Sequence, residues 1–340
     1  MKHIFYIHSY ITYLVSVKII ETENLLKKDC IFLINRKVII QDDVVSYAID
    51  HFCSSEAVPI TSNIIGGWQS LKNIDAFIDA ITSKEKFYLY LPNTRGRFIG
   101  ILTTHKKCLG YHFIEEGLAS YFRQEQANMN IAVRSFSLKE RVNKYLCYGN
   151  RLSNLHFYNS NYKNVYGLSV HSFPGFRNRV ILKDYVANNK EKEGIYDNAH
   201  IIVFDALVEF KIVTYESFIE SLRKLIAYFI ENSIRVVHYK LHPEQLKVNG
   251  CGKSIKEILE SVDVVKFLQI PEDTILELVI LNNSSLTFYI VVSSVGLYAA
   301  FYGHSVYSYM DNLKQGNERF KGLIEDLPNV FLKVIKQIQL

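Results

Sequence analysis

Short apolar runs alternate with longer stretches of helical character along most of this chain. Residues 30–34 and 87–91 are runs of five apolar residues, with the length and composition of buried strands. Residues 10–22 and 215–232 have the length of helices, and the second stretch is also amphipathic. Because strands that alternate with helices pair into mostly parallel sheets, the pattern predicts an α/β fold.

The expected elements form two series. The first has strands at 4–7, 30–34, 87–91 and 111–114, with helical stretches at 10–22 and 100–106. The second has strands at 200–204, 234–239, 264–267, 286–292 and 305–309, with helices at 215–232, 254–262, 274–281 and 295–302. Gly66-Gly67-Trp68 indicates a loop, and residues 329–340 indicate an apolar and basic helix.

A charged segment poor in apolar residues, 188–194, separates the two series and is the predicted domain boundary. A chain of 340 residues, 49% hydrophobic and with only six prolines, is long enough for two cores. We therefore expect an N-terminal domain over 1–190, a C-terminal domain over 195–326 and a final helix over 327–340.

Charge and cysteine content narrow the function classes. The net charge of +5 is small and its lysines and arginines are scattered, which argues against nucleic-acid binding but is compatible with an anionic membrane surface. Five cysteines, widely spaced and odd in number, indicate reduced thiols in a cytosolic protein. His8 and Ser9 interrupt the apolar N-terminus and no cleavage site follows, so we expect no export signal and a cytoplasmic location.

The first candidate site is Glu115-Glu116-Gly117, where an apolar strand stops at two carboxylates and turns into a helical stretch. Ligands of open α/β sheets bind at the carboxyl ends of the strands. Two adjacent like charges repel, so one of them is easier to protonate, and the pair is a candidate general base. The alternative is a solvated acidic turn.

Ser293-Ser294 and His242-Pro243 are two further strand-end features, both in the second series. Two hydroxyls at a helix start, with its unpaired N–H groups, suit one phosphate. An imidazole at a strand end can hydrogen-bond the same phosphate as it leaves. The alternatives are an ordinary helix cap for the serines and a capping histidine for His242.

Glu277 lies on a helix that starts soon after Pro271, and its carboxylate can accept hydrogen bonds from the two hydroxyls of a ribose. The alternative is a solvated helical glutamate. No Asp-x-Asp occurs in the chain, which fits a mechanism without a metal ion or other cofactor. Gly250 to Ser254 ends in Gly-Lys-Ser but lacks the first glycine of a phosphate loop.

Together these motifs resemble those of bacterial sialyltransferases. Glu115-Glu116-Gly117 is similar to their D/E-D/E-G motif, His242-Pro243 to their HP motif and Ser293-Ser294 to their paired serine motif. Residues 270–278, I-P-E-D-T-I-L-E-L, resemble the segment whose glutamate binds the cytidine ribose. The E-E-G-L-A-S-Y run is most similar to the polysialyltransferase-like and lipooligosaccharide sialyltransferase groups. The resemblance covers mainly 110–122 and 235–302.

This resemblance implies a GT-B architecture, with two Rossmann-like domains facing a central cleft, and transfer of sialic acid from CMP-sialic acid with inversion and without metal. It implies Glu115 as the base, with Glu116 as the alternative, and His242 as the group that stabilises the departing phosphate. Ser293 and Ser294 would hold that phosphate and Glu277 the ribose. Gly117, Pro243 and Pro271 belong to the same donor-binding motifs.

The implied acceptor is a galactose-terminated glycan of O-antigen, capsule or lipooligosaccharide, lipid-linked or free, at the inner face of the membrane. A GT-B transferase for CMP-Kdo, a UDP-sugar or a GDP-sugar, and a non-catalytic glycan-assembly protein, stay open. Residues 126–180, rich in aromatics and arginines, indicate either an acceptor- or membrane-facing surface or a loop-rich edge packed by its tyrosines. The tail, 331–336, can dock on lipid or pack back on the first domain.

Overall fold

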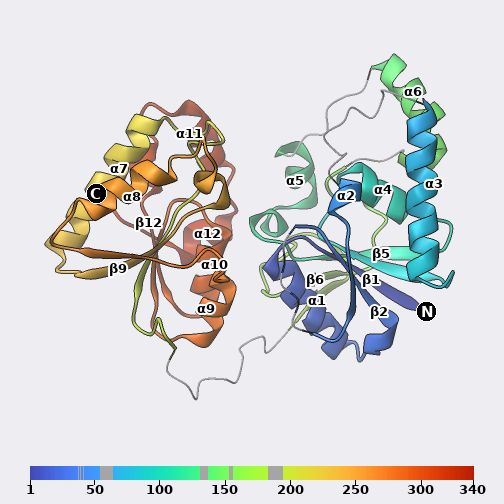
Figure 1. The fold of residues 1–340 in the computed structure, drawn as a ribbon, viewed down its shortest axis with the longest axis horizontal. Coiled ribbons are helices and arrows are strands. Elements are labelled where there is room, and N and C mark those ends of the chain that lie inside the picture. Colours follow the sequence, from blue (N-terminus) through green and yellow to red (C-terminus); the bar gives the residue numbers. More distant parts are fainter. Residues whose placement is uncertain are drawn as a thin grey trace. The chain divides into compact units, whose positions relative to one another are not determined.

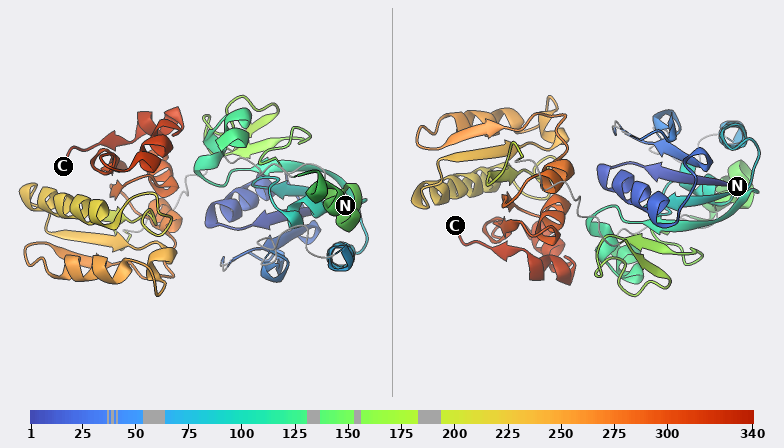
Figure 2. Two further views of the ribbon diagram at one scale, coloured as in Figure 1. Left: turned by 90° about the horizontal axis from the view of Figure 1, so that it is seen from above. Right: turned by 90° about the horizontal axis from the view of Figure 1, so that it is seen from below.

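The computed structural model describes residues 1–36, 38, 40, 42–53, 64–130, 137–152, 156–182 and 194–340. The chain divides into two units, Met1–Tyr185 and Val186–Leu340, coloured blue to green and yellow to red in Figures 1 and 2. The predicted boundary segment, 188–194, lies outside the described residues except for Gly194. Each unit contains one parallel sheet, as the alternation of strands and helices predicts.

The first sheet has seven parallel strands in the order β3-β2-β1-β4-β5-β6-β7. Its strands are β1 (Lys2–Ile7), β2 (Cys30–Ile34), β3 (Val45–Ala48), β4 (Phe87–Leu91), β5 (Cys108–Ile114), β6 (Val165–Gly167) and β7 (Arg179–Ile181). Its helices are α1 (Tyr10–Thr22), α2 (Asp50–Cys53), α3 (Ile64–Ile81), α4 (Arg97–Thr103), α5 (Gln124–Asn130) and α6 (Leu138–Tyr148). Short 3₁₀ turns are η1 (Lys27–Asp29), η3 (Leu118–Tyr121) and η4 (Gly149–Leu152).

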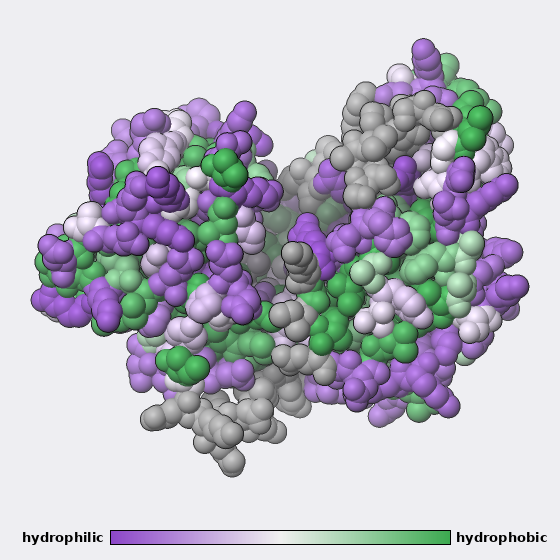
Figure 3. Space-filling model, in the orientation of Figure 1, coloured by the Kyte–Doolittle hydropathy of each residue, from purple (hydrophilic) through white to green (hydrophobic). Residues whose placement is uncertain are grey.

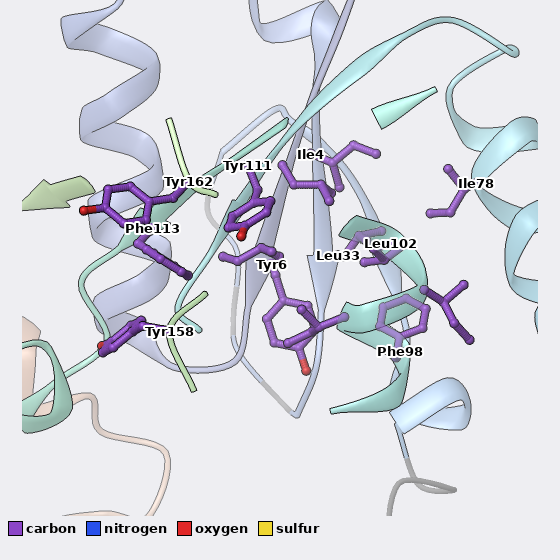
Figure 4. Packing of buried hydrophobic residues seen from close by; sticks show 14 of the residues in the cluster. Ile4, Tyr6, Leu33, Ile78, Phe98, Leu102, Tyr111, Phe113, Tyr158 and Tyr162 are labelled. Atoms are coloured by element: carbon purple, nitrogen blue, oxygen red, sulfur yellow. The ribbon is translucent and has the colours of Figure 1, made fainter. Parts of the chain in front are cut away.

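The core of the first unit lies between this sheet and the helices α3 and α4. Leu33 of β2 lies beside Leu102 of α4, and Phe113 of β5 packs against Tyr158, with ring centroids 4.9 Å apart (Figure 4). Ile78 of α3 belongs to the same cluster. The opposite face of the sheet is covered by α1, which packs on β1, β5 and β6. With helices on both faces, both sides of the strands are apolar, which is why they appear as continuous apolar runs in the sequence.

The predicted loop at Gly66-Gly67-Trp68 is wrong, because these residues lie inside α3. A Cβ on Gly67 would lie 2.6 Å from Cβ of Cys147, so the glycine permits α3 and α6 to approach closely. Gly67 is therefore explained by the close contact between α3 and α6 and not by a turn.

The described part of the stretch 126–180 is mainly the packed edge of the first unit. Of the eight phenylalanines and tyrosines that the structure describes in this stretch, seven are buried and Tyr145, on α6, is exposed. The buried ones are Tyr148, Phe157, Tyr158, Tyr162, Tyr166, Phe173 and Phe176.

The second sheet has six parallel strands in the order β10-β9-β8-β11-β12-β13. Its strands are β8 (His200–Val203), β9 (Val236–Lys240), β10 (Lys266–Gln269), β11 (Thr287–Ile290), β12 (Ser305–Ser308) and β13 (Lys336–Gln337). Its helices are α7 (Tyr215–Glu231), α8 (Gly252–Glu260), α9 (Leu276–Asn282), α10 (Ser294–Phe301), α11 (Glu318–Glu325) and α12 (Asn329–Val334), with the 3₁₀ turns η5 (Pro243–Leu246) and η6 (Met310–Leu313).

The chain ends in a strand and not in the expected continuous helix. The helix α12 ends at Val334, and β13 then pairs with β12 in the second sheet. Phe331 and Ile335 are buried, so the apolar side of the tail completes this unit. Among the described residues, every helix is too short or too polar to cross a membrane.

Candidate active site

Three strands of the first sheet are followed by polar side chains that contact one another. His8 follows β1, Asn93 follows β4 and Glu116 follows β5. Nε2 of His8 lies 3.0 Å from Oε2 of Glu116, and Nδ2 of Asn93 lies 3.3 Å from both carboxylate oxygens. The strand order reverses between β1 and β4, so this contact is at the switch point where open α/β sheets bind ligands.

The partners of Glu116 are themselves fixed. The backbone N–H of Arg95 donates to Oδ1 of Asn93 at 3.0 Å, which orients the amide with its NH₂ toward Glu116. Nδ1 of His8 is buried and has no hydrogen-bond partner within the described part of the chain, so the proton is assigned to Nε2, which donates to the carboxylate. The Glu116 carboxylate therefore receives two side-chain donors from two neighbouring strands, and its side chain is 10% exposed.

Glu115 points the other way and is fully buried. Its Oε2 accepts from the Leu168 N–H at 2.7 Å and from Ser172 Oγ at 2.6 Å, and its Oε1 accepts from the Tyr121 hydroxyl. The carboxylate ties β5 to the segment after β6. Adjacent strand residues face opposite sides of a sheet, and here only Glu116 reaches the edge.

Gly117 begins the turn after the two acids. Its φ of 141° lies in the region that favours glycine, and η3 follows at once. The turn brings Ser120 back, so that its Oγ accepts from the Glu116 N–H at 3.1 Å.

In the second unit, His242 caps the 3₁₀ turn η5. Its ring nitrogen Nδ1 accepts from the backbone N–H of Glu244 at 3.1 Å, while the backbone N–H of His242 donates to Oε1 of Gln245 at 2.9 Å. An Nδ1 that accepts a backbone N–H leaves the ring proton on Nε2. Pro243 is the first residue of the turn and fixes its backbone. The geometry makes Nε2 of His242 a hydrogen-bond donor.

Ser293 caps the helix α10, with its Oγ accepting from the Val295 N–H at 3.3 Å. Ser294 is the first residue of that helix. A Cβ on Gly296 would lie 2.3 Å from Cδ1 of Ile290, so the glycine lets the first turn of α10 lie against β11. This arrangement is an ordinary helix cap that also presents hydroxyls at a positive helix end.

A hydrogen-bonded chain joins the His242 turn to the Ser293 turn. Gln245, which is buried, donates from Nε2 to the backbone oxygen of Asp205 at 3.2 Å. Oδ2 of Asp205 in turn accepts from the Val292 N–H at 3.0 Å. Burial raises the pKa of the Asp205 carboxyl to about 6, although backbone N–H donors from β11's end oppose the shift. The ends of β8, β9 and β11 are thereby held as one edge.

Glu277 and Pro271 lie near Lys240 at the end of β9. Nζ of Lys240 donates to the backbone oxygen of Pro271 and, at 3.1 Å, to that of Thr274. Burial raises the pKa of Glu277, against the attraction of Lys240, and burial likewise lowers the pKa of Lys240. Glu277 is thus a partly buried carboxyl and not a solvated one.

The structure thus places the predicted residues in two sets, one at the edge of each sheet, except for Glu115, which is bound in the interior of the first unit. Sequence reasoning missed His8, Asn93, Asp205 and Gln245. The first three share one signal, since each is among the first polar residues after an apolar strand. Gln245 had no signal of its own, because its role depends on contacts with two other strand ends.

No family model matches the chain, and no curated protein matches it. Among solved structures, a candidate UDP-N-acetylglucosamine 2-epimerase from Listeria monocytogenes is similar, with a TM-score of 0.52 and 11% identity over 99% of this chain and 91% of that chain. The UDP-GlcNAc 2-epimerase from Methanocaldococcus jannaschii matches with a TM-score of 0.49 and 11% identity over 97% and 93%. MurG from Acinetobacter baumannii matches with a TM-score of 0.40 and 9% identity over 100% and 86%.

At such identities the likeness concerns the fold alone. The Listeria structure covers nearly the whole of this chain, and both sheets have Rossmann-like strand orders. The predicted α/β fold with two Rossmann-like domains of the GT-B type is confirmed.

Proposed function

We propose that this protein is a nucleotide-sugar glycosyltransferase and, more specifically, an inverting sialyltransferase that uses CMP-sialic acid without a metal ion. The observation that carries the proposal is the Glu116 carboxylate, held by His8 and Asn93 at the switch point of the first sheet. The sialyl donor is supported by the motif resemblance around His242, Ser293 and Glu277, and metal independence by the lack of an Asp-x-Asp pair.

Glu116 is the proposed general base. A base must have a lone pair directed at the hydroxyl proton, and Glu116 lies at the ligand-binding edge with two donors fixing its rotamer. Glu115 has three donors in the interior of the unit instead. The geometry therefore favours Glu116 as the general base, whereas the resemblance to the sialyltransferases implied Glu115.

In the proposed reaction the acceptor oxygen bonds to the anomeric carbon while the bond from that carbon to the CMP phosphate oxygen breaks. Glu116 takes the proton of the acceptor hydroxyl. The electron pair of the breaking bond goes to the phosphate, where Nε2–H of His242 donates to it. Ser293 and Ser294 hold the phosphate oxygens, and Glu277 accepts from the ribose hydroxyls.

The donor is tested by thermal shift with CMP, UDP and GDP, because a ligand that binds only the folded state raises its melting temperature. We expect CMP to stabilise the protein most. We also expect CMP release from CMP-sialic acid with a galactose-terminated acceptor in EDTA. Preference for UDP or GDP would move the proposal to another sugar donor, and no response to any nucleotide would favour a non-catalytic protein.

Ser293→Ala has a matched control in Thr214→Ala. Both side chains cap a helix of the second unit with an N–H to oxygen distance of 3.3 Å. Loss of either cap costs about 1 kcal/mol of stability. If Ser293 binds phosphate, only Ser293→Ala loses the CMP shift. If both variants show the same CMP thermal shift, Ser293 only caps the helix and does not bind the phosphate.

A further inference from the structure

The helix α6 in the first unit carries its apolar face outward. Leu138, Val142, Tyr145 and Leu146 are 79%, 52%, 58% and 46% exposed. Their spacing puts all four on one side of the helix, and we call them the α6 stripe. Cys147, which packs against Gly67 of α3, lies roughly opposite Leu138 at about 100° per residue. Figure 3 shows apolar surface over α6 at the upper right.

Cations border the α6 stripe on both sides. Lys139 and Arg141 are exposed and flank it on the helical wheel. The acid of this turn, Glu140, is engaged at the helix start, where its Oε2 accepts from the N–H of Ser137 at 2.8 Å and from its hydroxyl at 2.9 Å. An apolar face edged by Lys and Arg is the pattern of a helix that lies in the surface of an anionic membrane.

We propose that the α6 stripe docks the first unit on an anionic lipid surface, with the four apolar side chains among the acyl chains and Lys139 and Arg141 at the headgroups. A second copy of the chain fits less well. The helix has 11 residues and is about 16 Å long, whereas a stable protein interface buries roughly 800 Å² per partner. The proposal stands independently of the sugar donor.

The test is flotation of the full chain with vesicles of phosphatidylcholine alone and of phosphatidylcholine with phosphatidylglycerol, at low and high salt. We expect binding to the anionic vesicles that weakens with salt. Leu138→Gln with Val142→Gln keeps helix propensity and removes two apolar side chains, so binding should fall about tenfold or more. Lys139→Gln with Arg141→Gln should weaken it about fivefold per cation.

The control is Ile195→Gln with Val248→Gln, which removes two apolar side chains that are 95% and 102% exposed in the second unit. It should bind vesicles as the wild type does. The proposal is overturned by a lack of preference for anionic vesicles, or by equal losses in the stripe and control variants. It is also overturned if the stripe variant instead abolishes a dimer seen by light scattering. Because all these side chains are exposed, unchanged melting temperatures verify folding.

Discussion

Replacing Glu115 by glutamine should lower the free energy of unfolding of the first unit enough to distinguish its structural role from the catalytic role proposed for Glu116. Glu115 is fully buried and accepts from Leu168 N–H, Ser172 Oγ and the Tyr121 hydroxyl. Glu115→Gln keeps the shape of the side chain and removes its charge. The three donors then face an amide with one oxygen and one NH₂ group.

The magnitude follows from those three bonds. A hydrogen bond to a charged group contributes about 1.5–3 kcal/mol and a neutral one about 1 kcal/mol. Converting three such bonds therefore destabilises the first unit by roughly 3 kcal/mol. Oε2 can stay the amide oxygen, and the Tyr121 hydroxyl can rotate to accept from the NH₂ group, so the loss need not be larger.

The assay is urea unfolding followed by tryptophan fluorescence. The single tryptophan, Trp68, lies on α3 and so reports the first unit. Glu21→Gln is the control, since that carboxylate is 60% exposed and its ion-pair partner is Lys18. We expect the control to stay within about 0.5 kcal/mol of the wild type. If Glu115→Gln is as stable as the control but loses activity, the reasoning fails and Glu115 is the base.

Three further predictions concern other residues. Burial, with smaller contributions from nearby cations, lowers the pKa of His112 to about 4. In the unfolded chain the imidazole takes up its proton below about pH 6.5. The folded state therefore loses stability as the pH falls from about 6.5 toward 4. Urea midpoints should show that the wild type loses about 2 kcal/mol more than His112→Phe between pH 7 and 5. Gly67→Ala should cost about 1–3 kcal/mol in the same assay, because its Cβ would meet Cys147 at 2.6 Å, and an unchanged midpoint would contradict the close contact. His242→Asn replaces the capping acceptor Nδ1 with the side-chain oxygen of asparagine and removes the Nε2 donor, so kcat for CMP release should fall about 100-fold at an unchanged melting temperature; undiminished kcat would remove His242 from the mechanism.

Apolar runs that are buried on both faces were predictable from the sequence, as β4 at Phe87–Leu91 shows. β3 was missed because Val45–Ala48 is a short and mostly exposed edge strand. β6 and β7 have three residues each, too few to show a strand pattern in the sequence. β6 forms by pairing with β5, and β7 by pairing with β6. Gly67 was misread because its partner, Cys147, lies far along the chain.

The candidate site was predictable in its chemistry but not in its connections. Glu116 and His242 follow apolar strands, and that position alone marks a sheet edge. The pairing of Glu116 with His8 depends on β1, β4 and β5 lying side by side, which local patterns do not give. The choice between Glu115 and Glu116 likewise needed the positions of Tyr121 and Ser172.

The most direct test of the account is the turnover of Glu116→Gln, measured as acceptor-dependent CMP release from CMP-sialic acid. The variant keeps the side-chain shape and loses the proton acceptor at the edge of the first sheet. We predict a fall in kcat of about 100-fold or more, with the melting temperature and the CMP thermal shift of the wild type. Turnover at the wild-type rate in this folded, CMP-binding variant would contradict the account.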